Sequence, residues 1–247
     1  MTLRGLLKAG GWGKLAELVV FPSFCRLCGR LLEKPGEKVV CAACWASLRP
    51  PRDSLCPSCG RFFEGNGESH FCGRCLDARP RVSVHRSCGE YRGALKDLIL
   101  LFKYRKFSVL GRGLADFAGR AVGGDEELWW GVEALVPVPL HPRRKRDRGF
   151  NQSRVFAGEV GKAFRLPVLD GALVKVRHTP PQTSLESRDR AENVRGAYRV
   201  KRAGQVRDRT LLLVDDVCTT GSTINECARV LLAAGAKEVR ALTIARA

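Results

Sequence analysis

Four Cys-x-x-Cys pairs constrain this chain more than any other feature of its sequence. Twelve residues separate the two pairs of each set, and the second set repeats the first 31 positions later, Cys56 following Cys25. A unit of this size is too small for a hydrophobic core and needs a covalent or metal staple. The eight cysteines are Cys25, Cys28, Cys41, Cys44, Cys56, Cys59, Cys72 and Cys75.

Paired cysteines at this spacing predict zinc sites rather than disulfides in a chain that is not secreted. Zinc takes four thiolates in a tetrahedron, and a two-residue gap lets one tight turn supply two of them. We therefore expect two structural zinc ions, one in each quartet. His70, near Cys72, is either a replacement ligand or, as is more common, a surface histidine of the loop. The unpaired Cys88, Cys218 and Cys227 are expected to be small buried residues.

The charge balance and the N-terminal segment bear on partners and location. Lys and Arg number 43 against 25 Asp and Glu, a formal charge of +18, which favours polyanionic partners or phosphorylated ligands. No apolar run approaches the roughly 18 residues of a membrane span, and Lys8 and Glu17 interrupt the N-terminal apolar residues, against a signal peptide. We expect an amphipathic helix within residues 1–22, at 13–21, and a cytoplasmic protein, with peripheral contact at the inner membrane face as the alternative.

Residues 81–247 alternate between strand-like and helix-like patterns. Such alternation predicts an open parallel α/β sheet, preceded by a small cysteine-rich zinc-binding domain at 23–80. Ligands of such sheets bind at the carboxyl ends of the strands. The expected strands are 134–139, 210–216 and 238–245, and the expected helices are 93–107, 109–122, 151–164, with Asn151 as cap, and 222–236.

The stretch LLLVDDVCTTGSTI, residues 211–224, predicts the ligand of that edge. Thr219, Thr220, Gly221, Ser222 and Thr223 form a loop entering a helix, whose free N–H groups and positive dipole end attract phosphate.

The carboxylates of Asp215 and Asp216 repel phosphate, so they are placed to accept hydrogen bonds from sugar hydroxyls or to act through a divalent metal. A phosphate beside a diol predicts a ribose 5-phosphate. A Walker B strand would need a G-x-x-x-x-G-K-[ST] loop, which the chain lacks, and "GRGLADFAG" lacks the third Rossmann glycine. Asp216 as a turn or cap residue is the bland alternative.

LLLVDDVCTTGST resembles the 5-phosphoribosyl 1-diphosphate (PRPP) signature of type I phosphoribosyltransferases, and nearly the whole chain resembles the ComF/GntX family. The likeness includes VPVPLHPRRKRDRGFNQS at 136–153 and QTSLESRDRAENVRGAY at 182–198. In that family a cysteine-rich zinc segment precedes a phosphoribosyltransferase-like domain, as expected here for 23–80 and 81–247. The second cysteine set departs from the single unit of many members.

The resemblance implies roles for individual residues. Asp215 and Asp216 would hold the ribose hydroxyls, with Arg148 as a further catalytic residue and Mg²⁺ accompanying PRPP. Lys103 either reaches the site from its helix or lies on a solvated face, and the basic loop at 143–146 is either a phosphate site or solvated. The pyrophosphate loop would be Pro139, Leu140, His141, Pro142 and Arg143, and the flexible loop would contain Gln182, Arg188 and Asn193.

The resemblance also implies two functions. One is a phosphoribosyltransferase, transferring a pentosyl group by displacement at ribose C1, linked to competence or to use of DNA. The alternative is a non-catalytic zinc-containing adaptor that binds single-stranded DNA or a competence helicase. Aromatic residues are only 7% and form no stacking ladder with basic residues, which weakens the adaptor hypothesis.

Overall fold

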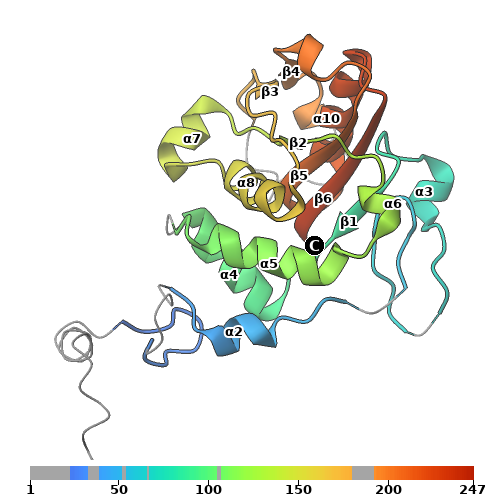
Figure 1. The fold of residues 1–247 in the computed structure, drawn as a ribbon. Coiled ribbons are helices and arrows are strands. Elements are labelled where there is room, and N and C mark those ends of the chain that lie inside the picture. Colours follow the sequence, from blue (N-terminus) through green and yellow to red (C-terminus); the bar gives the residue numbers. More distant parts are fainter. Residues whose placement is uncertain (1–22, 33–38, 52–53, 66, 105–106, 180–191) are drawn as a thin grey trace, which may run out of the picture. The chain divides into compact units, whose positions relative to one another are not determined.

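The computed structural model describes residues 23–32, 39–51, 54–65, 67–104, 107–179 and 192–247. It divides into two compact units, Met1–Leu48 and Arg49–Ala247. The first contains the first cysteine quartet and helix α2 (Ala42–Ser47). The second contains the second quartet, helix α3 (Gly73–Asp77) and the α/β fold (Figure 1). The predicted boundary near residue 80 stays a prediction, and the predicted helix at 13–21 lies outside the described residues.

A parallel four-stranded sheet forms the centre of the second unit. Its strands are β1 (His85–Ser87), β6 (Glu238–Arg246), β5 (Thr210–Cys218) and β2 (Ala134–Pro137), in that order across the sheet. All three pairings are parallel, which confirms the fold class predicted from the alternating pattern. The first five residues of β5 are buried, in keeping with an apolar run covered on both faces.

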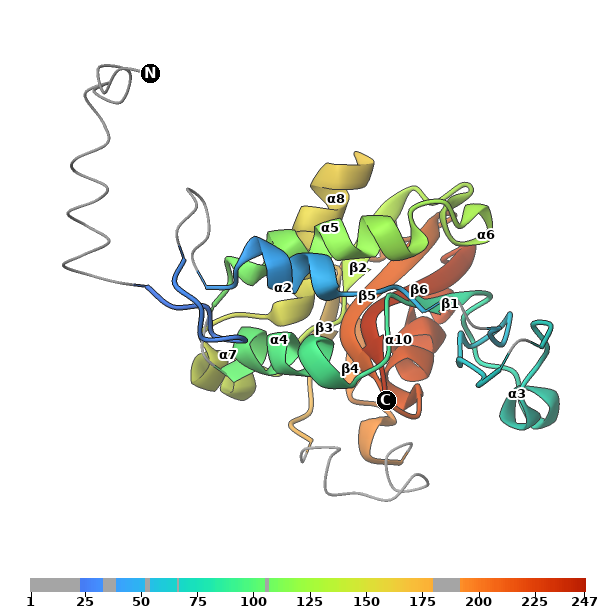
Figure 2. The same cartoon turned by 90° about the horizontal axis from the view of Figure 1, so that it is seen from below.

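Helices cover both faces of this sheet (Figures 1 and 2). On one side α8 (Gln152–Phe164) packs on β2 and β5, α5 (Leu110–Val122) packs on α8, and α4 (Gly93–Tyr104) packs on α5. The other side carries α10 (Ser222–Ala233), which packs on β5 and β6. The Asn151 side chain accepts from the Ser153 N–H and caps α8, as predicted.

The sequence did not predict the smaller elements. Strand β1 is three polar residues, HRS, and α7 (Pro142–Arg148) is polar on every side, so neither shows an apolar period. Helix α7 nevertheless carries start signals, a capping His141 side chain and a proline at its first position. The others are helices α2, α3 and α6 (Glu126–Trp129), strand β3 (Leu173–Lys175), antiparallel to β4 (Tyr198–Val200), and the 3₁₀ turn η3 (Ala203–Gln205).

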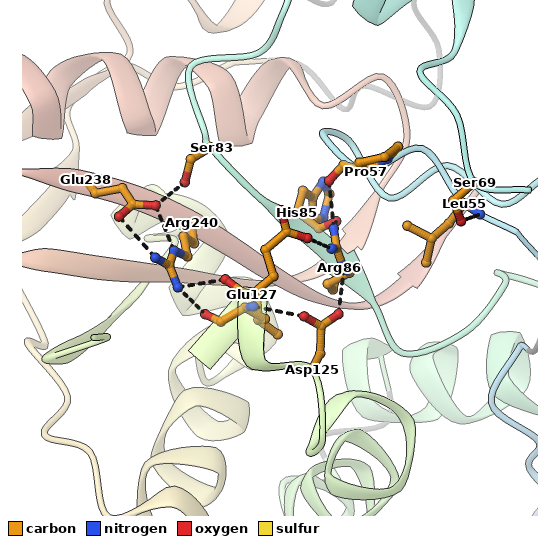
Figure 3. A network of polar contacts seen from close by, with 11 residues as sticks. Leu55, Pro57, Ser69, Ser83, His85, Arg86, Asp125, Glu127, Glu238 and Arg240 are labelled. Carbon is orange, nitrogen blue, oxygen red and sulfur yellow. Dashed lines mark hydrogen bonds and ion pairs between the residues drawn. The ribbon is translucent and has the colours of Figure 1, made fainter. Parts of the chain in front are cut away.

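A buried arginine on β1 ties the second cysteine region to the sheet (Figure 3). Arg86 is 6% exposed. Its Nε donates to Asp125 Oδ2 at 2.7 Å, its Nη1 donates to the Pro57 carbonyl at 2.8 Å, and its Nη2 pairs with Glu127. The other oxygen of Asp125 caps α6 by accepting from the Leu128 N–H at 2.9 Å. One guanidinium thus joins three segments.

A second arginine completes this network from β6. Arg240 Nη1 donates to the carbonyls of Glu127 and Trp130, at 2.7 and 2.8 Å, and its Nε pairs with Glu238 at 2.8 Å. Glu238 also accepts from the Ser83 hydroxyl (Figure 3). The guanidinium groups of the two arginines are themselves buried, and these carbonyls and carboxylates give them the partners that buried polar groups need.

Replacing Arg86 should destabilise the second unit. We expect Arg86→Ala to lower the free energy of unfolding by about 3 kcal/mol, because it leaves the carboxylate of Asp125 without its cation. The control is Arg92→Ala: Arg92 pairs with Glu90 but its side chain is 77% exposed, so its loss should cost less than about 1 kcal/mol. Urea unfolding with zinc present would measure both, and equal losses would contradict this account.

Candidate functional site

The carboxyl ends of β2 and β5 open into a cavity of about 520 Å³. It brings together residues that the sequence singled out in three separate motifs. These are Asp215 and Asp216 near the end of β5, Thr219 and Thr223 beyond it, Pro139 and Leu140 after β2, and Arg148 of α7. Arg144, from the basic run 143–146, also lines the cavity, whereas Tyr91, Tyr104, Lys175 and Tyr198 were not predicted to act there.

Asp215 is enclosed by protein except for an opening toward the cavity. Its Oδ1 accepts from the Ser153 hydroxyl at 2.7 Å and from the Asp216 N–H at 2.9 Å. Burial, together with the neighbouring charge of Asp216, raises the pKa of Asp215 to about 7, even though these hydrogen bonds favour the carboxylate. Asp215 can therefore hold or release a proton near neutral pH.

Asp216 has a cation in contact with it. Lys103, from the last turn of α4, places Nζ 2.8 Å from Asp216 Oδ1, and both side chains are 14% exposed. Of the two alternatives for Lys103, the structure thus favours a lysine that reaches the site over one on a solvated face. A ligand hydroxyl that binds Asp216 must share this carboxylate with Lys103 or displace it.

The loop after β5 has the geometry of an anion-binding helix start. Gly221 is the N-cap of α10 with a φ of +81°. An added Cβ would meet only Cys218 Sγ, at 3.9 Å, so the positive φ rather than crowding favours glycine here. The hydroxyls of Thr220 and Ser222 lie 2.8 Å apart. The first turn of α10 contains no acidic residue, so no carboxylate there repels an anion at this helix start. The Ser222 N–H donates to Thr220 Oγ1 at a long 3.4 Å.

Two arginines of α7 face the cavity because they are four residues apart on one side of the helix. Arg144 Nη2 donates to the Thr179 carbonyl at 3.0 Å. Arg148 Nη1 donates to Gln152 Oε1 at 3.2 Å, and its guanidinium lies 5.3 Å from the centre of the Tyr104 ring. Arg144, a member of the basic run 143–146 for which a phosphate site was one alternative, therefore lines the cavity.

The predicted pyrophosphate loop is divided between cavity and helix. Pro139 and Leu140 line the cavity. His141, Pro142 and Arg143 begin α7, where the His141 Nδ1 accepts from the Arg143 N–H at 3.3 Å. The side chain of Arg143 is exposed and is not among the lining residues. A cation in this region comes from Arg144, one position further on.

Lys175 is a further cation that no motif indicated. It lies in β3, donates to Thr179 Oγ1 at 2.8 Å and places Nζ 5.1 Å from the centre of the Tyr198 ring. Burial, and then the nearby Arg144, lower the pKa of Lys175 to about 8. The strand is three residues long, too short for a period-2 pattern to reveal which side chain points inward.

The structure describes only one of the three residues predicted for the flexible loop. Gln182 and Arg188 lie outside the described residues. Asn193 is described, and its backbone carbonyl accepts from Arg177 Nη2 at 2.9 Å. It is not among the residues that line the cavity.

The cysteine quartets have the geometry of metal sites. Within each quartet all four sulfurs lie within 4.8 Å of one another. Individual Sγ–Sγ distances are 3.8 Å for Cys25–Cys44 and 3.7 Å for both Cys28–Cys41 and Cys59–Cys72. Tetrahedral zinc with bonds of about 2.3 Å separates its ligands by about 3.8 Å, whereas a disulfide would need about 2.05 Å. Both donor sets therefore fit zinc.

The other thiols and the alternative ligand have structural surroundings. His70 stacks on Phe63, with ring centres 4.0 Å apart, and is not part of the quartet. Cys88, Cys218 and Cys227 are buried, as predicted. Among the described residues, clusters of three or more metal-ligating side chains occur only at the two quartets. Asp215 and Asp216 still offer the one or two carboxylates that Mg²⁺ takes when phosphates supply its other ligands.

Comparisons with known proteins place the chain in a family. A double zinc ribbon domain matches residues 17–76, and a phosphoribosyl transferase domain matches residues 151–247. Competence protein F of Haemophilus influenzae is 32% identical over 176 residues, which are 70% of this chain and 77% of that protein. The chain belongs to the ComF family.

Two further relatives bear related names. Competence protein ComFC of Streptococcus pneumoniae is 28% identical over 162 residues, 66% of this ComF chain and 68% of the relative. DNA utilization protein YhgH of Escherichia coli K12 is 36% identical over 114 residues, 46% of this chain and 49% of the relative. The family predicted from the motifs is thus confirmed. Within the part of this ComF chain that the structure describes, no helix has the length and apolar character needed to span a membrane.

The raised pKa of Asp215 predicts a pH effect on stability. Its pKa in the folded state is about 7, above the value of about 3.9 in the unfolded chain. The folded state therefore binds the proton more tightly, and the contribution of Asp215 to the free energy of unfolding falls as the pH rises from about 4 to 7. Asn cannot ionise, so Asp215→Asn should not lose stability in this pH range. At pH 8 we expect its free energy of unfolding to exceed that of the wild type by about 1–4 kcal/mol. Urea unfolding of both proteins at several pH values would measure the difference.

The difference between the two proteins is the readout, because acid also releases metal from thiolates. The control is Asp170→Asn, since Asp170 is 49% exposed and pairs with Arg154. A wild-type–variant difference that does not change with pH would contradict the raised pKa.

Proposed function

We propose that this protein binds PRPP, or another ribose 5-phosphate, together with Mg²⁺ and transfers the phosphoribosyl group to a nitrogen acceptor. The observation that supports the proposal most is the arrangement of side chains at the end of β5 and in the loop that follows it. The carboxylates of Asp215 and Asp216 face the same cavity as Thr219 and Thr223 of the phosphate loop. A sugar that bridges a phosphate and a vicinal diol fits this pairing of carboxylates with an anion-binding helix start.

The residues of the cavity divide the substrate between them. The N–H groups and hydroxyls of 219–223 would bind the 5-phosphate. Asp215 and Asp216 would accept hydrogen bonds from the 2′ and 3′ hydroxyls and hold Mg²⁺, whose charge balances that of the pyrophosphate. Arg144 and Arg148 would bind the pyrophosphate directly, where guanidinium groups give charge-assisted hydrogen bonds.

The chemical step is a displacement at ribose C1. The bond from C1 to the pyrophosphate oxygen breaks, a bond from C1 to the acceptor nitrogen forms, and the acceptor loses a proton. The cations of α7 stabilise the negative charge that develops on the leaving pyrophosphate. Closure of the segment around Gln182 and Arg188 over the ligand would exclude water, which otherwise hydrolyses PRPP.

The names of the relatives suggest the setting of this activity. Two are competence proteins and one is a DNA utilization protein, so we propose service in DNA uptake or in the use of DNA, in the cytoplasm. The outward face of α7 favours a second candidate, the zinc-containing adaptor for single-stranded DNA or a competence helicase. Arg143, Lys145 and Arg146 are exposed there, and the chain's charge is +18.

The double variant Asp215→Asn with Asp216→Asn separates the two candidates. It should weaken PRPP binding at least about 100-fold, because two charged acceptors of the ribose hydroxyls are lost. Binding of single-stranded DNA should be unchanged or slightly tighter, since two negative charges are gone. Calorimetry with PRPP and Mg²⁺ and a DNA titration on the same preparations would measure both. A wild type that binds no PRPP at millimolar concentration would leave only the adaptor.

A double variant of α7 should have the opposite effect, weakening DNA binding without changing PRPP binding. Arg143→Gln with Arg146→Gln neutralises outward cations and spares Arg144 and Arg148. It should weaken DNA binding at low salt and reduce the salt slope by up to about 2, while PRPP affinity stays the same. A DNA affinity that does not respond would place the DNA footprint outside α7.

For the metal, we propose two zinc ions per chain, one in each cysteine quartet. Both sets of sulfurs have tetrahedral spacing and belong to the matched double zinc ribbon. Elemental analysis of protein purified without added metal should give close to two zinc ions. A value near one would assign the ion to a single quartet, and a value near zero would exclude structural zinc.

A further inference from the structure

The second cysteine quartet lies against the strand that leads into the phosphate loop. Arg246, at the end of β6, donates through Nη1 to the Cys59 carbonyl at 2.6 Å. The same Nη1 lies 3.7 Å from the sulfur of Cys218, and Nη2 lies 3.8 Å from the sulfur of Cys59. Cys218 is the residue directly before the loop 219–223. One guanidinium therefore joins a predicted zinc ligand to the start of the phosphate loop.

Two further contacts reach the loop itself and the helix behind it. Arg74, in α3 between the ligands Cys72 and Cys75, donates through Nη2 to the Thr220 carbonyl at 3.4 Å. The Arg81 N–H, where the cysteine segment ends, donates to Asn225 Oδ1 in the first turns of α10 at 2.6 Å. The contacts of the cysteine segment therefore reach Cys218 just before the phosphate loop, Thr220 within it and Asn225 just after it.

The segment is also fixed tightly to the sheet. The His85 N–H of β1 donates to the Ser58 carbonyl at 3.0 Å, and Arg86 donates to the carbonyl of Pro57 next to it (Figure 3). At Gly60 an added Cβ would lie 2.3 Å from the His85 carbonyl oxygen, whereas at the corresponding Gly29 of the first repeat it would meet nothing within 4 Å. The second repeat is therefore shaped for this contact.

Very little besides the metal holds the segment together. Its buried cluster consists of Cys56, Cys72 and Cys75, with the partly buried Cys59, Phe63 and Phe71 packed against them. Four of these six residues are the predicted ligands. Without the ion the segment has almost no core, and metal binding in such small units supplies the free energy of folding.

We infer that the second cysteine quartet braces the phosphate loop, so that metal binding at Cys56, Cys59, Cys72 and Cys75 sets the affinity of the loop for a phosphorylated ribose. Arg74 and Arg246 are positioning residues in this scheme, since neither lines the cavity. Arg74 donates to the Thr220 carbonyl and Arg246 contacts the Cys218 sulfur. Together they restrain 218–220, so that the N–H groups of the loop are in position before the ligand binds. The inference rests on the proposed function for its ligand, but not for the brace itself.

The brace has a readout that needs no ligand. In the full chain loaded with zinc we would compare Cys59→Ser, which disrupts the second quartet, with Cys28→Ser, which disrupts the first. Each variant should lose about one zinc ion in a colorimetric release assay. Hydrogen exchange of peptides that cover 217–226 should speed up at least about tenfold in Cys59→Ser only, because the loop loses its support.

Binding of ribose 5-phosphate, measured by calorimetry, is the second readout. Cys59→Ser should weaken it about tenfold or more, and Cys28→Ser should not change it. Equal changes in both variants, or no change in Cys59→Ser, would overturn the inference. If the wild type binds neither ribose 5-phosphate nor PRPP, the proposed function fails, while the exchange of 217–226 still decides whether the brace exists.

A milder variant covers the case in which Cys59→Ser does not fold. Arg74→Ala leaves all eight cysteines in place and should keep two zinc ions. It should still speed exchange at 219–223 and weaken ribose 5-phosphate binding about threefold to tenfold, as expected for one charge-assisted hydrogen bond. Arg74→Lys should restore part of the affinity. An Arg74→Ala protein with wild-type exchange and affinity would overturn the inference.

Discussion

Strand β5 is paired on both edges, with β2 and with β6, and covered on both faces by helices. That burial fixes the direction in which the strand leaves the core, and with it the place where Asp215, Asp216 and the loop that follows emerge. A one-residue slip against its neighbours would move every buried side chain to the other face. The cavity depends on this register, because the ends of β2 and β5 and the loops that follow them form part of its wall.

The charged groups of the site surround the carboxylates of Asp215 and Asp216. Partial burial raises the free energy of a charged carboxylate unless it has polar partners. Asp215 is stabilised by neutral donors, from Ser153 and the backbone, whereas Asp216 has the cation of Lys103. Burial and the neighbouring charge of Asp216 raise the pKa of Asp215. Around them lie Arg144, Arg148 and Lys175. The cavity therefore suits a ligand that combines hydroxyl donors with several negative charges.

The two cysteine repeats share their cysteine spacing and the Gly-Arg after the second cysteine, and they differ in their surroundings. Gly29 and Gly60 both adopt a positive φ, as the turn after each second cysteine requires. Only Gly60 lies against another strand, at His85. A motif repeated for one purpose, metal binding, has thus gained at its second copy a packing role beside the phosphate loop, and arginines at 74, 86 and 246 form the polar contacts between them.

By itself the sequence determined the features that depend on neighbours along the chain. These are the cysteine spacing, the apolar run of β5, the Asn151 cap and the small-residue loop at 219–223, because local geometry and periodicity encode them. Only the tertiary structure decided which side chains from distant segments meet. Ser153 reaches Asp215 and Lys103 reaches Asp216. Of the predicted Arg143, Arg144 and Arg148, the last two line the cavity, because the helical period of α7 places them on one side. The sequence did not predict strand β1 or the inward position of Lys175 in β3. Both strands are three residues long, too short for a periodic pattern, and packing alone sets the orientation of their side chains.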